Sequence, residues 1–107
     1  MTDLAQVVAQ SADTANLHAT APALLLELQT QLGALAATAT AATERGRRPF
    51  RPTPDWNQHL GLLAYGIYLL ADQSGADLDR EVRAVAEATN NRAASERRGI
   101  ESWPFPT

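Results

Sequence analysis

The chain has 107 residues, of which 45% are hydrophobic and 20% charged, and its formal net charge at pH 7 is −3. This balance is typical of one globular domain and excludes a disordered chain, and the mild charge gives no general attraction to nucleic acid. Cysteine is absent, which excludes disulfides, thiolate zinc sites and a cysteine nucleophile. The N-terminus lacks an apolar core of signal-peptide length, so we expect a cytoplasmic protein.

Alanine supplies much of the hydrophobic content, whereas large apolar side chains are few. Because alanine buries little surface, one copy of the chain would have a thin core. We therefore expect the chain to complete its core by self-association, as a dimer or a tetramer. We expect no membrane partner, since the apolar runs are short and interrupted by polar residues.

Two helices are predicted in the first half of the chain. Residues 3–18 carry a weak apolar stripe with helical spacing. Thr20 followed by Pro22 is typical of a helix start, with threonine as the N-cap and proline in the first turn. This second helix is predicted to end at Gly46. Its apolar seam comprises Leu24, Leu28, Leu32, Leu35 and Ala39.

The stretch from Trp56 to Gln73 is strongly apolar and is predicted to be the central helix. It follows an Arg/Pro loop (46–54), whose prolines exclude a helix interior. Because apolar side chains occupy much of its circumference, we expect the rest of the bundle to bury this helix. Its predicted seam is Leu60, Leu63, Ile67 and Leu70, and its small residues Gly61, Ala64 and Gly66 would let another backbone approach closely.

A fourth helix is predicted to start after Asp77 and to run to about Arg98, with charged residues on its outer face. Its seam comprises Leu78, Val82, Val85 and Thr89. The tail (99–107) contains two prolines and is expected to be extended. No segment shows the alternation of a strand, so the prediction is a single all-α domain over residues 1–107, a bundle of about four helices with its core in 21–98.

Two six-residue segments, QLGALA (31–36) and HLGLLA (59–64), share the order polar–Leu–Gly–x–Leu–Ala. On two helices, this repeat predicts a crossing with glycine at the closest approach. Together with DREVRAVAEATNNR (79–92), the two segments resemble the MazG-like, all-α nucleoside triphosphate pyrophosphohydrolase superfamily. The resemblance covers about residues 24–98. It implies a helical bundle in which paired motifs hold magnesium against a triphosphate.

The chain departs from that superfamily at the metal-binding positions. The four carboxylates of the paired motifs correspond here to Gln31, Ala34, His59 and Leu62. Magnesium requires charged oxygen ligands, which none of these residues supplies. We therefore expect no metal, no cofactor and no magnesium-dependent hydrolysis at this position. The expected function is binding of a nucleotide-like small molecule, or action as a regulatory partner.

Three groups of side chains are candidates for ligand binding. A polar pair would lie inside the bundle and either contact a ligand or form a mutual hydrogen bond. Arginines of the Arg/Pro loop could clamp phosphate, or could simply be solvated. Three residues late in the fourth helix match positions near the nucleotide in the superfamily. The candidates are Gln31 and His59; Arg47, Arg48 and also Arg51; and Asn90, Asn91 and Arg92.

Two alternative functions remain open. The chain could be an active nucleoside triphosphate pyrophosphohydrolase with a reduced magnesium site, for which the catalytic candidates are Glu27, Asp55 and His59, with Asp72 as a further carboxylate. It could instead be a structural module for protein–protein interaction. No zinc spacing, glycine-rich phosphate loop or helix-turn-helix pattern is present, so no nucleic-acid partner is expected.

Overall fold

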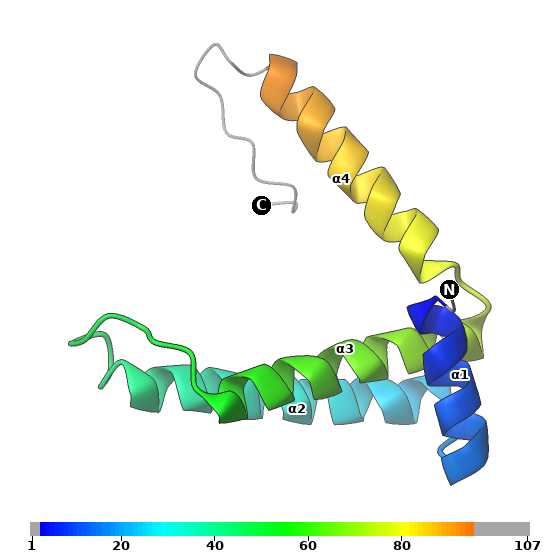
Figure 1. The fold of residues 1–107 in the computed structure, drawn as a ribbon, viewed down its shortest axis with the longest axis horizontal. Coiled ribbons are helices and arrows are strands. Elements are labelled where there is room, and N and C mark those ends of the chain that lie inside the picture. Colours follow the sequence, from blue (N-terminus) through cyan, green and yellow to red (C-terminus); the bar gives the residue numbers. More distant parts are fainter. Residues whose placement is uncertain (1–2, 96–107) are drawn as a thin grey trace. The chain divides into compact units, whose positions relative to one another are not determined.

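The computed structural model describes residues 3–95, which form four α-helices and no strand (Figure 1). The helices are α1 (Leu4–Ala15), α2 (Ala21–Ala42), α3 (Pro54–Ser74) and α4 (Leu78–Ser95). The predictions of an all-α chain and of about four helices are confirmed for this part of the chain. The chain divides into two compact units, Met1–Ala76 and Asp77–Thr107, which we describe separately. The assignment of residues 1–107 to one domain remains a prediction.

The helix starts follow local capping residues, whereas α1 and α2 end before their predicted limits. Thr20 and Thr53 adopt extended backbone conformations, and their hydroxyl oxygens accept hydrogen bonds from the third residue beyond each of them. Gly75 ends α3 with a φ of 73°, in the left-handed region that glycine occupies without steric cost. Asn16 adopts the same conformation and ends α1 earlier than predicted.

The helix α2 also ends before its predicted limit at Gly46. Its last helical residue is Ala42, and the backbone then turns through three successive left-handed residues, Glu44, Arg45 and Gly46, with φ of 48°, 60° and 87°. Thr43 lies at this end, and its hydroxyl donates to the carbonyl of Ala39. Threonine has a low helix propensity, which is consistent with the earlier stop.

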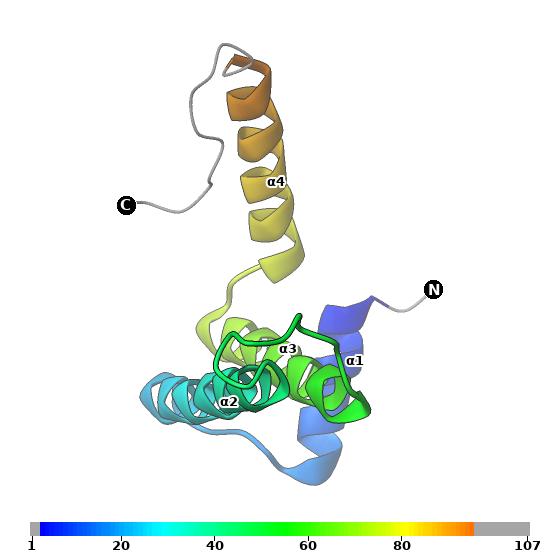
Figure 2. The same ribbon diagram turned by 90° about the vertical axis from the view of Figure 1, so that its left-hand side faces the viewer.

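Helices α2 and α3 run in opposite directions side by side and form the largest packing interface of the first unit (Figures 1 and 2). On both helices the residues along the contact are buried or half-buried and recur at alternating steps of three and four, the spacing of antiparallel helix pairs. We call this line of contact the seam. It comprises Leu24, Leu28, Gln31, Leu35, Thr38 and Ala42 on α2, and Trp56, His59, Leu63, Gly66 and Leu70 on α3.

The observed seam differs from the predicted one at several positions. Leu32, Leu60 and Ile67 were predicted to face the core but are exposed. The line of contact between α2 and α3 passes through their chain neighbours Gln31, His59 and Gly66 instead, although both lines have steps of three and four. The predicted glycine crossing is also wrong, since a Cβ placed at Gly33 or Gly61 would meet no atom within 4 Å. The close approach occurs at Gly66, where a Cβ would lie 2.7 Å from Leu28 Cδ2.

Helix α1 crosses α3 and closes a small core near one end of the helix pair (Figures 1 and 2). This core contains Val8 and Ala12 of α1, Leu24 of α2 and Leu69 of α3. The central helix is less enclosed than predicted: among its residues only Leu69 and Ala71 are buried. Two helices cannot surround a third, so much of the apolar circumference of α3 faces outward.

The described part of the second unit is the single helix α4. The Asp77 carboxylate accepts a hydrogen bond from the Arg80 backbone N–H and so caps its start, as predicted. None of its residues is buried, and both Val82 and Val85 are exposed. The predicted end near Arg98 and the predicted extended tail (99–107) lie outside the described residues. Between residues 3 and 95, no helix is both long and apolar enough to cross a bilayer.

Candidate functional site

The polar pair of the two repeated motifs lies on the seam, but its members are not in register. Leu28 packs against Gly66, so in the antiparallel pair Gln31 lies level with about Leu63. His59 is four residues from that level, which is about 6 Å along the helix axis at a rise of 1.5 Å per residue. Both side chains are half-buried between α2 and α3.

The two polar side chains do not pair with each other. Gln31 Nε2 donates a 3.0 Å hydrogen bond to Glu27 Oε1, one turn earlier on the same helix. His59 Nδ1 is shielded from solvent and has no hydrogen-bond partner in the described part of the chain. Of the two roles left open for this pair, the mutual hydrogen bond between Gln31 and His59 is therefore not formed. The imidazole occupies a position where an apolar side chain would cost less.

The remaining positions of the paired motifs offer no ligand for a cation. Ala34 is half-buried and Leu62 is exposed, and neither side chain has an oxygen. Among residues 3–95, no group of three His, Asp or Glu side chains is close enough to hold a metal ion. The residues at this position therefore do not fit the magnesium that the superfamily resemblance implies.

The carboxylates of the alternative reduced site are far apart. Glu27 lies beside Leu28, which contacts Gly66, whereas Asp55 is 11 residues before Gly66 on α3. That separation is about 16 Å along the axis. Asp72 is exposed near the other end of α3, 17 residues or about 26 Å from Asp55. The structure does not bring these three acids together.

A polar pocket lies at the end of the helix pair where the chain passes from α2 to α3. It has a volume of about 380 Å³ and is lined by Ala42, Arg48, Pro49 and Arg51. We call it the arginine pocket. Its volume is in the range of small-molecule sites. Of the predicted arginines, Arg48 and Arg51 line the pocket, whereas Arg47 is exposed and is not among the lining residues.

The connection around this pocket is held in a defined conformation. The backbone N–H groups of Arg45 and Arg48 donate to the carbonyls of Thr40 and Thr43. The rings of Phe50 and Trp56 pack edge to face with their centroids 4.7 Å apart, which anchors the connection to the first turn of α3. Left-handed non-glycine residues such as Glu44 and Arg45 each cost about 1–3 kcal/mol and are typical of ligand-binding segments.

One carboxylate would compete with a bound phosphate group for Arg48 of the arginine pocket. Glu44 Oε1 lies 3.3 Å from Arg48 Nε and forms an ion pair with it, and both side chains are more than half exposed. The connection from 43 to 53 nonetheless carries four arginines against this single acid, a local charge of +3 in a chain whose net charge is −3. In the sequence, the feature that indicates this pocket is the high density of arginine between residues 43 and 53.

The third predicted group lies on α4, in the other unit. Asn90, Asn91 and Arg92 are exposed on its later turns. Asn90 and Asn91 are adjacent in the chain and so point about 100° apart around the helix. They belong to the second unit, and their assignment to a ligand site remains a prediction.

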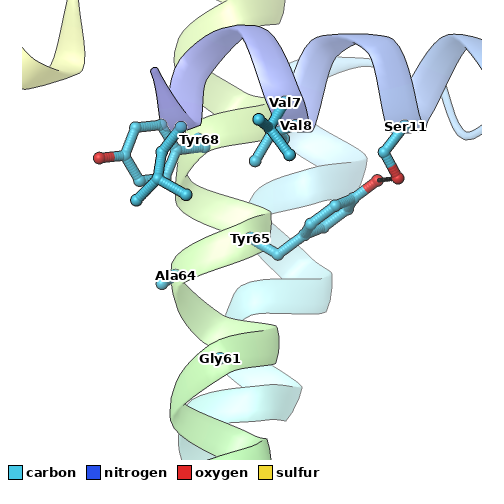
Figure 3. A pocket seen from close by; sticks show the side chains of 8 residues that line it. Val7, Val8, Ser11, Gly61, Ala64, Tyr65 and Tyr68 are labelled. Carbon is cyan, nitrogen blue, oxygen red and sulfur yellow. Dashed lines mark hydrogen bonds between the residues drawn. The ribbon is translucent and has the colours of Figure 1, made fainter. Parts of the chain in front are cut away.

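A second hollow, between α1 and α3, is almost entirely apolar (Figure 3). It has a volume of about 360 Å³, and its lining includes Val7, Gly61, Ala64 and Tyr68. Ser11 Oγ and the Tyr65 hydroxyl lie 3.0 Å apart at one side of it and form the hydrogen bond drawn in Figure 3. No charged side chain lines this hollow, so it offers nothing to a phosphate group.

His18, which carried no signal in the sequence, connects two helices. Its Nε2 pairs with Asp13 near the end of α1, and its Nδ1 lies 2.8 Å from the Gln73 amide nitrogen of α3. An amide N–H can only donate, so Nδ1 accepts this hydrogen bond and the proton of a neutral imidazole is on Nε2. Since Gln73 is 55 residues away in the chain, only the fold could reveal the connection.

Comparison with known proteins adds no assignment. The chain matches no known protein family, no curated protein and no solved structure. The function therefore has to be inferred from the residues and the geometry described above.

Proposed function

We propose that this protein is a MazG-like helical protein that binds a phosphate-bearing small molecule in the arginine pocket without hydrolysing it through magnesium. The observation that carries this proposal is the pair Arg48 and Arg51, which line one pocket of ligand size in an ordered, positively charged connection. Guanidinium groups stay charged at neutral pH and bind phosphate oxygens through paired N–H donors.

The same features argue against turnover. Phosphoryl transfer requires stabilisation of the charge that develops on the phosphate oxygens and an activated water, which the enzymes of the superfamily that the sequence resembles obtain from magnesium. Here the four metal-binding positions carry Gln31, Ala34, His59 and Leu62, and the nearest alternative acids are spread along the helices. Arginines alone can hold a phosphate group but do not generate the nucleophile.

Titration calorimetry with inorganic triphosphate and a panel of nucleoside triphosphates tests the proposal. We expect binding that weakens with added salt and that falls at least tenfold in the double variant Arg48→Gln/Arg51→Gln. The variant Arg80→Gln/Arg83→Gln removes the same charge from α4 and is the matched control, with wild-type affinity expected.

Two results would overturn the proposal. One is an equal loss of affinity in both double variants, which would mean attraction by net charge alone. The other is release of pyrophosphate from a nucleoside triphosphate in the presence of magnesium, with turnover abolished by Glu27→Ala or Asp55→Ala, which would identify an active enzyme.

A further inference from the structure

The ion pair between Glu44 and Arg48 is built into the turn that follows α2. The backbone N–H of Glu44 donates a 3.2 Å hydrogen bond to the carbonyl of Ala41. The backbone N–H of Arg48 donates a 2.9 Å hydrogen bond to the carbonyl of Thr43. The turn itself therefore holds the two residues so that the carboxylate meets the guanidinium, with Glu44 Oε1 3.3 Å from Arg48 Nε.

The backbone conformation of Glu44 gives no structural reason for a glutamate at this position. Its φ of 48° lies in the left-handed region, where glycine and asparagine are favoured. A residue that keeps a full side chain in this region is typical of a functional contact. Among residues 3–95, the ion pair that the carboxylate of Glu44 forms is with Arg48, which lines the arginine pocket.

The two arginines of the pocket differ in their availability to a ligand. No carboxylate between residues 3 and 95 forms an ion pair with Arg51. On Arg48, by contrast, Glu44 occupies the Nε side of the guanidinium, which is part of an edge that binds oxyanions through paired N–H donors. A phosphate group would thus reach Arg51 directly but would have to displace Glu44 from that edge of Arg48.

We propose that Glu44 is an internal competitor for phosphate, and that ligand binding exchanges its carboxylate for a phosphate group on Arg48. This inference rests on the proposed function, because it concerns regulation of the same pocket. Glu44 is 51% exposed, so water solvates the displaced carboxylate at low cost. A terminal phosphate group carries up to two negative charges and three acceptor oxygens, against the single charge of Glu44, and this difference drives the exchange.

Titration calorimetry of the full chain with inorganic triphosphate at low salt tests the exchange. We expect Glu44→Gln and Glu44→Asn each to bind triphosphate about threefold to tenfold more tightly than the wild type, since each removes an exposed ion pair and a nearby negative charge. Asparagine tolerates the left-handed conformation, so Glu44→Asn keeps the turn. A gain in affinity cannot result from a loss of folding.

The variant Arg48→Gln separates competition on Arg48 from general repulsion by Glu44. If the carboxylate and the phosphate group share this guanidinium, Glu44→Gln should tighten binding in the Arg48→Gln background by about half that factor or less. General repulsion would instead give the same factor in both backgrounds. Glu87→Gln removes the same charge from α4 and is the matched control, with wild-type affinity expected.

Two results would overturn this inference and leave the proposed function standing. One is a wild type that binds triphosphate through Arg48 and Arg51, with an affinity that Glu44→Gln and Glu44→Asn do not change. The other is equal tightening by Glu44→Gln with and without Arg48. If neither the wild type nor Glu44→Gln binds triphosphate, the proposed function is wrong, and this inference is wrong with it.

Discussion

At the scale of single residues, the two histidines have opposite surroundings. His18 is bound on both ring nitrogens, to Asp13 and to Gln73, and so joins α1 to α3. His59 sits on the seam with its Nδ1 shielded and without a partner in the described residues. A polar atom that loses water without gaining a hydrogen bond destabilises the fold, by about 1–3 kcal/mol. The seam therefore tolerates His59 rather than requiring it.

We predict that His59→Leu raises the free energy of unfolding by about 1 kcal/mol and Tm by several degrees, because it removes the unpaired nitrogen and adds apolar contact on the seam. The control His18→Leu should lower stability, since it deletes both hydrogen bonds of that imidazole. Thermal denaturation followed by circular dichroism measures both. A clear loss of stability in His59→Leu would contradict this account of the seam.

At the scale of helices, α3 has three faces with different neighbours. One face meets α2 along the seam, a second meets α1 near Leu69, and a third carries the exposed Leu60 and Ile67. Its interior glycines differ accordingly. Gly66 leaves room for Leu28, whereas Gly61 borders the open hollow beside α1.

Substitutions at these two glycines should therefore have opposite effects. Gly61→Ala places a methyl group in open space and should stabilise the protein by about 0.5–1 kcal/mol, because alanine favours the helix. Gly66→Val places branched carbon against Leu28 and should destabilise it by about 1–3 kcal/mol. Urea denaturation of both variants measures the difference. Equal changes would mean that α2 and α3 do not approach at Gly66.

At the scale of the whole molecule, the described chain leaves many large apolar side chains exposed and buries few. Between residues 3 and 95, six hydrophobic residues are buried, four of which belong to the core beside α1. Burial of so few side chains offsets little of the conformational entropy lost on folding, which is why we expect the chain to associate with itself. The arginine pocket lies at one end of the helix pair, away from Leu25 and Ile67.

If the chain is a homodimer, its stability must depend on its concentration. We predict that Tm of the wild type falls measurably on tenfold dilution, because unfolding is then coupled to dissociation. Differential scanning fluorimetry at concentrations tenfold apart measures this shift in Tm. A Tm that does not vary with concentration in the wild type would contradict the coupling.

Local chemistry is what the sequence by itself determined. Thr20 starts α2 as predicted, and Thr53 and Gly75 bound α3 by the same local chemistry, since capping depends on residues within one turn of each other. The sequence also shows directly that Gln31, Ala34, His59 and Leu62 are not carboxylates. It shows equally that arginines are concentrated before Trp56. Each of these inferences needs only neighbouring residues.

Only the tertiary structure decided which side of each helix is inside. Leu32 and Gln31 are adjacent, yet the polar residue lies on the seam and the leucine is exposed, because the crossing of α2 and α3 selects the register. The tertiary structure also decided that Leu28 packs at Gly66 and not at Gly61, and that His18 contacts Gln73. Hydrophobicity ranks residues for burial, but with more apolar faces than one chain can cover, packing geometry chooses among them.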